Sequence, residues 1–221
     1  ALTSRQQNQF IQRSGNGTLA LNNHVDNATE SDAWFNLLFS LPTVYQEQVI
    51  NEAKAPILWQ LYQQKNLPTK VTVIHGENTT HLPDWFPLLT EPEFTQSISP
   101  LLQEISPTIN KIGIFVYYFS GTSDYQLELF VDAILLAQQA KADKDIVWIS
   151  SMGNKNTSGA FGAKPSLITL NTSSNNVALL TNNMDIQPTI LANISNCSID
   201  KSLYTTGDNL VNLKTNRTLA N

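Results

Sequence analysis

The chain has 221 residues, of which 41% are hydrophobic and 14% are charged, with a formal net charge of −5 at pH 7. This apolar content supports a folded core and excludes an intrinsically disordered chain. Because Lys and Arg form no cluster, nucleic acid is disfavoured as a main partner, and so is a strong electrostatic attachment to anionic lipid. The length suits one domain over residues 1–221.

The first half of the chain alternates between helix patterns and strand patterns. Residues 4–14 and 30–45 predict helices, and Pro42 stops the second of them. Pro56 opens a further helix over residues 55–66, because proline is tolerated in a first helical turn. Two apolar stretches predict strands, at residues 17–25 and 70–76.

The second half continues this alternation. Residues 97–109 predict a helix broken by prolines, and the apolar run 111–119 predicts a strand covered on both faces. The longest helix is expected over residues 123–142, with one apolar stripe formed by Tyr125, Leu129, Ala133 and Leu136. The remaining pattern predicts three strands, a short helix opened by Asp185 and a turn, at residues 145–151, 165–170, 177–181, 185–195 and 204–210.

Several of the predicted strands are apolar throughout, and helices separate most of them. This pattern predicts an α/β fold in which a mainly parallel sheet is sandwiched between helices. In such a fold, functional side chains gather where the strands end. Four segments are therefore candidates, at residues 24–32, 75–84, 119–124 and 150–158.

Polar side chains in two of these segments are candidate ligand contacts. His75 follows a predicted strand beside Gly76, and Asn78 lies in the same loop. Lys155 is the only cation of residues 150–158, and it can meet a phosphate as a point charge. A solvated loop lysine is the simpler alternative.

Two further features lie between residues 75 and 86. Trp85 and Phe86 form an apolar stretch punctuated by prolines, which predicts a patch facing a membrane or a protein partner. A metal site can be drawn from His75, His81 and Asp84, but this spacing matches no standard zinc pattern and no thiolate supports it. A hydrogen-bonded loop histidine is favoured, so no metal site is predicted.

The segment from Thr29 to Asp32 has two interpretations. Thr29 suits the N-cap of a helix, with acidic residues following in the first turn. The alternative makes Thr29 or Ser31 a catalytic nucleophile, and a hydroxyl needs a base or a metal ion to become one. The cap is favoured.

Four segments, taken in order, resemble the alkaline-phosphatase/sulfatase superfamily. They are "NNHVDNATESDAWFNLLFSLPTVY" (22–45), "VTVIHGENTTHLPDWF" (71–86), "SDYQLELFVDAILLAQQAKADKDIVWISS" (123–151) and "DIQPTILANISNCSIDKSLYTTGDNL" (185–210). The likeness is to the branch of lipoteichoic acid synthases, phosphoethanolamine transferases and YejM (PbgA)-like inner-membrane proteins. "LFSLPTVY" and the pair "DIQPT…TTGDNL" favour the YejM-like proteins.

The sequence departs from this family where the family binds its divalent metal, such as Zn or Mn. The family's nucleophile, a Thr two places before an Asp, aligns with Glu30, and the family's "DHG" position reads "SMGNKN". The later family His falls within "FGAKP", and the first strand with its acidic ligand precedes Ala1. The resemblance therefore implies a truncated or reduced sulfatase-like fold with a degenerate active site and no cofactor.

The expected function is that of a catalytically inactive periplasmic domain, tethered to the inner membrane by segments outside this chain. It would sense or bind lipid, lipopolysaccharide or an inner-membrane protein partner. One alternative is a metal-dependent sulfatase, phosphoethanolamine-type transferase or hydrolase, with Thr29 as nucleophile and its missing ligands supplied from outside this chain. Another is an unrelated α/β binding module.

Overall fold

The structure is a computed structural model that divides into two compact units, Ala1–Glu52 with Ile146–Asn221 and Ala53–Asp145. The expectation of one domain over the whole chain stays a prediction. Among the residues described, no helix is long and apolar enough to cross a membrane. The described residues are 8, 11–12, 18–25, 29–76, 82–86, 91–109, 112–120, 124–139, 146–149, 164–169, 175–195 and 205–213.

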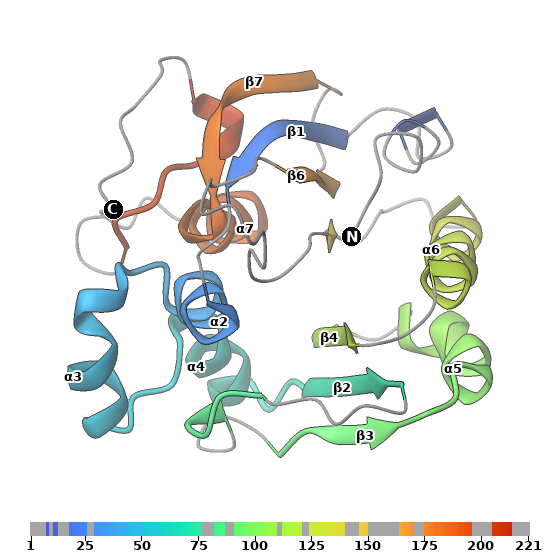
Figure 1. The fold of residues 1–221 in the computed structure, drawn as a ribbon, viewed down its shortest axis with the longest axis horizontal. Helices are drawn as coiled ribbons and strands as arrows, with labels where there is room; N and C mark the ends of the chain where they lie inside the picture. The colour runs from blue at the N-terminus through green and yellow to red at the C-terminus, as the bar shows by residue number, and fades with distance from the viewer. Residues whose placement is uncertain are drawn as a thin grey trace. The chain divides into compact units, whose positions relative to one another are not determined.

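The first unit contains a four-stranded sheet with the strand order β5-β6-β1-β7. Strand β1 pairs antiparallel with β6 and parallel with β7, and β5 pairs antiparallel with β6. Figure 1 shows β1 between its two neighbours. The elements of this unit are β1 (Thr18–Val25), α2 (Glu30–Phe39), η1 (Thr43–Tyr45), α3 (Gln46–Asn51), β5 (Val147–Ile149), β6 (Lys164–Thr169), β7 (Asn175–Asn182), η3 (Asn183–Asp185), α7 (Ile186–Ser195) and η5 (Leu210–Asn212).

The core of the first unit joins its sheet to α7 and to the segment that follows. Leu21 of β1 and Ile168 of β6 are fully buried, and Ile186 and Leu210 are 2% exposed. Helix α2 adds a buried apolar face that includes Trp34, which is 2% exposed. Burying such side chains contributes about 1.5–3 kcal/mol each, before the cost of ordering the chain.

The second unit contains a three-stranded, fully parallel sheet with the order β3-β2-β4. The central strand β2 is buried from Val71 to Ile74. Its core cluster combines Ile74 with side chains of two helices, Leu101 and Ile105 of α5 and Phe130 of α6. The elements are α4 (Ile57–Gln64), β2 (Thr69–His75), β3 (Glu93–Thr95), α5 (Ser99–Ile109), β4 (Ile114–Ser120) and α6 (Asp124–Gln139).

The predicted mixed α/β fold is confirmed, but the described strands form two sheets where we expected one. Three strand pairs are parallel, and the two that involve β6 with β1 and β5 are antiparallel. An apolar run indicates burial on both faces, which is typical of parallel sheets but does not fix the direction of an individual strand. The connections and the neighbouring strands therefore decided the pairing.

Two details of the helix predictions were wrong. Helix α5 runs unbroken to Ile109 despite Pro107, and its buried Leu101 and Ile105 anchor it in the core. In α6 the buried stripe centres on Phe130 and is continued by neighbours at helical spacing. Leu129 and Ala133 of the predicted stripe pack against this core, whereas Tyr125 and Leu136 are 67% and 68% exposed.

Strand β4 also differs from its prediction. All of its residues from Ile114 to Ser120 are half-buried, where we had expected coverage on both faces. The reason is its position at one edge of the described three-stranded sheet, whereas β2 occupies the centre. One face of β4 is packed, since Tyr117 and Phe119 both contact the ring of Phe130.

Candidate functional site

His24 lies in the interior of the first unit and is 1% exposed. It is paired in register with Thr181 of β7, and its Nδ1 lies 3.1 Å from the Thr181 hydroxyl oxygen. Its Nε2 lies 3.0 Å from Oδ1 of Asn183. Because an amide oxygen only accepts, Nε2 carries the proton and Nδ1 accepts from the Thr181 hydroxyl.

Burial lowers the pKa of His24 to about 4, because desolvation disfavours the charged ring. The hydrogen bond to Asn183 and the carboxylate of Asp185 oppose this shift more weakly. The ring is therefore neutral near pH 7 and is fully engaged by its neighbours. This arrangement gives His24 a structural role in joining β1 to the end of β7.

The described residues of "DIQPT…TTGDNL" (185–210) form a buried network, which we call the Asp185 network. The carboxylate of Asp185 accepts hydrogen bonds from the backbone N–H groups of Asn182 at 2.9 Å and Asp208 at 2.8 Å. The Thr189 hydroxyl donates to the carbonyl of Asp185 at 2.6 Å and accepts from the Leu210 N–H at 2.9 Å. These bonds tie the start of α7 to residues 208–210.

A glycine is required where the two halves of the Asp185 network meet. A Cβ on Gly207 would collide with the backbone carbonyl of Met184 and press on the N–H of Asp185. Neither backbone group can move aside as the end of a flexible side chain would. The "DIQPT…TTGDNL" pattern therefore has a structural explanation in this chain, namely close packing of two backbone segments.

The N-terminus of α2 carries the residues considered as nucleophiles. The predicted cap is confirmed, since the Thr29 hydroxyl oxygen accepts from the N–H of Asp32 at 3.1 Å. Glu30 and Asp32 are the acidic residues of the first turn, where the helix dipole favours negative charge. The Ser31 hydroxyl accepts a hydrogen bond of 3.4 Å from the side-chain amide of Gln46.

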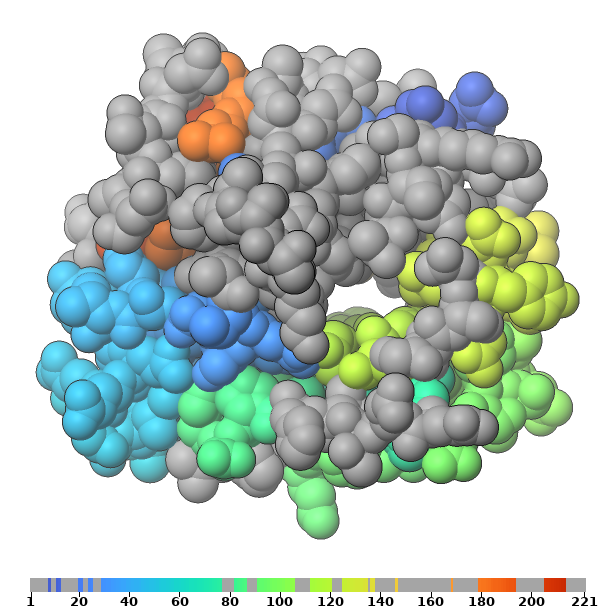
Figure 2. All heavy atoms as spheres, viewed as in Figure 1, coloured from blue at the N-terminus to red at the C-terminus, as the bar shows by residue number. Residues whose placement is uncertain are grey.

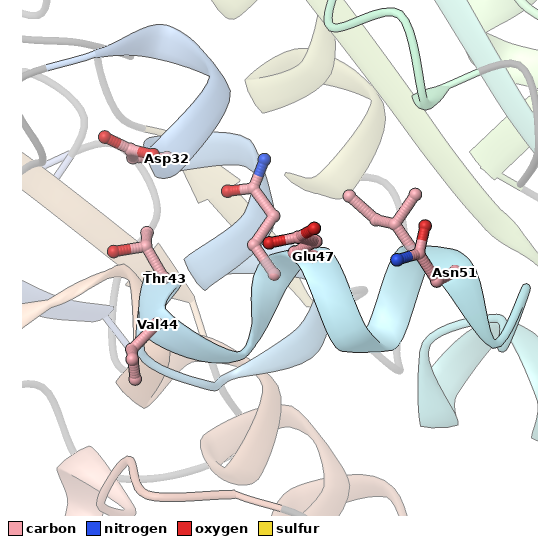
Figure 3. Close-up of a pocket in the computed structure, with 7 residues that line it drawn as sticks. Asp32, Thr43, Val44, Glu47 and Asn51 are labelled. Atoms are coloured by element: carbon pink, nitrogen blue, oxygen red, sulfur yellow. The ribbon is translucent and has the colours of Figure 1, made fainter.

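A shallow hollow of about 570 Å³, open to solvent, lies between the first turn of α2 and the segment from η1 to α3. Figure 3 shows Asp32 on one side, with Thr43, Val44, Glu47 and Asn51 on the other. In Figure 2 the helices that frame it form a broad exposed area in blue and light blue. We call it the α2–α3 hollow, and its lining residues are Asp32, Thr43, Val44, Gln46, Glu47, Ile50 and Asn51.

Sequence reasoning found one side of the α2–α3 hollow and missed the other. Asp32 lay in a predicted functional segment, whereas Gln46 and Glu47 belong to no recognisable motif. The sequence signal for this second side was the apolar pair Val44 and Tyr45 after Pro42. Two apolar residues in a short turn between helices either pack into a core or form an exposed patch that can meet a partner.

His75 lies half-buried at the carboxyl end of β2, level with Ser120 of β4. Its Nδ1–H donates to the carbonyl of Gly76 at 3.0 Å, and its ring meets Phe94 edge-on at 6.4 Å between centroids. Phe94 is 58% exposed, so this edge of the parallel sheet carries an aromatic surface. A ligand-contact role for His75 stays a prediction.

The patch expected around Trp85 is not seen at that residue. Trp85 is 9% exposed and Phe86 is fully buried, with their ring centroids 6.0 Å apart. Burial of the large apolar rings outweighed the pattern of prolines around them. The predicted contacts at Asn78 and Lys155, and His81 of the alternative metal site, lie outside the described residues.

Within the described part of the chain, no three His, Cys, Asp or Glu side chains come together as metal ligands. Comparison with models of known protein families found no match to this chain, and comparison with curated proteins found none either.

Proposed function

We propose that this chain is a catalytically inactive, sulfatase-like periplasmic domain, held at the inner membrane by segments outside it. Its role is to bind lipid, lipopolysaccharide or an inner-membrane protein partner. The order of the four family-like segments supports the relationship. The observation that carries the loss of catalysis is that the Thr29 hydroxyl accepts a hydrogen bond from Asp32 as a helix cap.

The chemistry of a hydroxyl nucleophile supports this proposal. Threonine attacks a phosphate or sulfate ester only when a base or a metal ion removes its proton. His24 is the histidine nearest to Thr29 in the sequence, and its ring nitrogens are engaged by Thr181 and Asn183 in the interior. The family's Asp-His ligand pair is replaced in the sequence by "SMGNKN".

The test uses the full-length protein and measures metal binding and turnover together. Calorimetric titrations with zinc, manganese and magnesium are combined with metal analysis of the same sample. Turnover is measured with p-nitrophenyl phosphate and p-nitrophenyl sulfate, for the native protein, Thr29→Ala and Thr29→Ser. We expect no stoichiometric metal and no turnover that depends on Thr29.

Tight one-to-one metal binding, with turnover abolished in Thr29→Ala, would overturn the proposal. It would establish the alternative, a metal-dependent transferase or hydrolase with Thr29 as nucleophile. The binding role is tested separately by flotation of the full-length protein with liposomes that contain lipopolysaccharide and by co-purification with inner-membrane proteins. Neither association would be expected if the domain had no binding role.

A further inference from the structure

We propose that the α2–α3 hollow docks a cationic, partly aliphatic segment of a protein partner. This inference rests on the proposed binding role and narrows it from a lipid or a protein to a protein. Three properties of the hollow carry it: a rigid frame, exposed apolar side chains and two carboxylates.

The frame of the hollow begins at the end of α2. Ser40 adopts the left-handed conformation with φ 55°, and its N–H donates to the carbonyl of Asn36 at 2.9 Å. The Asn36 side-chain amide in turn donates to the carbonyl of Leu41 at 2.6 Å. The chain therefore leaves α2 in a fixed direction, towards Pro42 and η1.

Residues 205 and 206 hold this turn through a second set of hydrogen bonds. The carbonyl of Ser40 accepts from the Thr205 hydroxyl at 3.0 Å and from the Thr206 N–H at 3.1 Å. The amide of Gln46 reaches across to Ser31. Because the surface is already ordered, a partner would lose little free energy in ordering it.

The turn presents apolar side chains to solvent in spite of this rigid support. Val44 is 80% exposed and the adjacent Tyr45 is 47% exposed. Ile50 lines the same hollow and is half-buried. Aromatic side chains such as Tyr45 are enriched at the centre of protein interfaces, where apolar neighbours exclude water and polar groups form the rim.

The charge of the hollow decides between the two classes of partner. Asp32 and Glu47 both line it, and in the described part of the chain neither carboxylate forms a salt bridge. Phosphate groups of lipopolysaccharide or anionic phospholipid would be repelled. A Lys or Arg side chain can lay its aliphatic stem on Val44 and direct its charge towards Glu47.

The test selects peptides from a random phage-displayed library on the full-length protein. Selection runs in parallel on the native protein, on Glu47→Gln and on a matched control, Glu91→Gln, which removes an exposed carboxylate of the other unit. We expect enriched peptides to carry Lys or Arg next to Leu, Ile or Val. This enrichment should persist with Glu91→Gln and disappear with Glu47→Gln.

The strongest peptide is then titrated by calorimetry. We expect the affinity of the peptide to fall about fivefold with Glu47→Gln and about tenfold with Val44→Asn. It should also fall as the salt concentration rises, and it should be unchanged with Glu91→Gln. No enrichment, enrichment of acidic or neutral peptides, or equal affinity of all variants would overturn the inference. The inference would also be overturned if no peptide were selected and the protein bound liposomes in a way that Val44→Asn abolished. That outcome would assign the hollow to lipid.

These outcomes are independent of the test for catalysis. A protein without metal and turnover that selects no basic peptide retains the proposed inactive role and loses only this docking site. A protein with Thr29-dependent turnover loses the proposed function, whatever peptides it selects.

Discussion

The Asp185 network and the α2–α3 hollow belong to the same unit and use polar side chains in opposite ways. Asp185 is fully buried, and both of its carboxylate oxygens accept backbone hydrogen bonds. Glu47 is an exposed residue whose carboxylate lines an open hollow. The network joins residues 182–189 to residues 207–210, whereas the hollow is lined by residues 32–51.

This contrast distinguishes polar residues that folding requires from polar residues available for binding. Buried polar groups are retained because an unmade hydrogen bond in the interior costs about 1–3 kcal/mol, so such residues can persist without any catalytic role. Exposed polar groups carry no such penalty, and their function depends on what they meet.

Replacing Asp185 with Ala should lower the free energy of unfolding by about 4 kcal/mol, because the buried N–H of Asn182 and the partly buried N–H of Asp208 both lose their acceptor. The measurement is urea denaturation followed by circular dichroism. Val211→Ala serves as the control, since Val211 is 43% exposed and lies in the adjoining segment. A loss below about 1 kcal/mol would contradict the structural role of the network.

Acidification should destabilise the protein through His24. The pKa of His24 is about 4 in the folded protein, against an ordinary value of 6.5, so the unfolded chain binds the proton more tightly between these values. Stability contributed by the neutral ring is present above pH 6.5 and is lost as the pH falls towards 4, by about 3 kcal/mol. Urea denaturation at pH 7 and at pH 4 measures this loss. The free energy of unfolding of His24→Gln should fall less between pH 7 and pH 4 than that of the native protein. An equal fall would refute the assignment of this loss to His24.

Replacing Thr29 with Ala should lower the free energy of unfolding by about 1 kcal/mol, since the N-cap acceptor of α2 is lost. Thr29→Ser and Thr29→Asp retain an acceptor and should lie close to the native protein. Thermal denaturation of the three variants checks the order. Equal stability of Thr29→Ala and the native protein would remove the structural explanation for Thr29 and strengthen its alternative as a nucleophile.

Changes at the exposed side of the α2–α3 hollow should barely affect folding. We expect Glu47→Gln and Val44→Asn each to change the free energy of unfolding by less than about 0.5 kcal/mol, because Glu47 is exposed and Val44 is 80% exposed. The same denaturation experiment measures this. A larger loss would mean that these side chains support α3, and would erase the contrast with the Asp185 network.

The sequence predicted most of the individual elements because their signals are local. Strand β1, helix α2 with its Thr29 cap, helix α4 after Pro56 and strand β2 all lie close to where apolar spacing and capping residues placed them. Two of the four residues predicted for the α6 stripe, Tyr125 and Leu136, were wrong because several adjacent faces of this helix are apolar in sequence. Only packing against Ile74, Ile98 and the α5 side chains selected the face that contains Phe130.

Local sequence signals were sufficient for the α/β class, most element types and the cap of α2, because these depend on residues within a few positions of one another. The tertiary structure decided strand direction, the separation of the described strands into two sheets and the burial of Trp85. It also decided that His24 and Asp185 are structural while Glu47 and Val44 line a surface hollow. Those outcomes depend on contacts between residues far apart in the chain, as with His24 and Asn183, which local spacing does not encode.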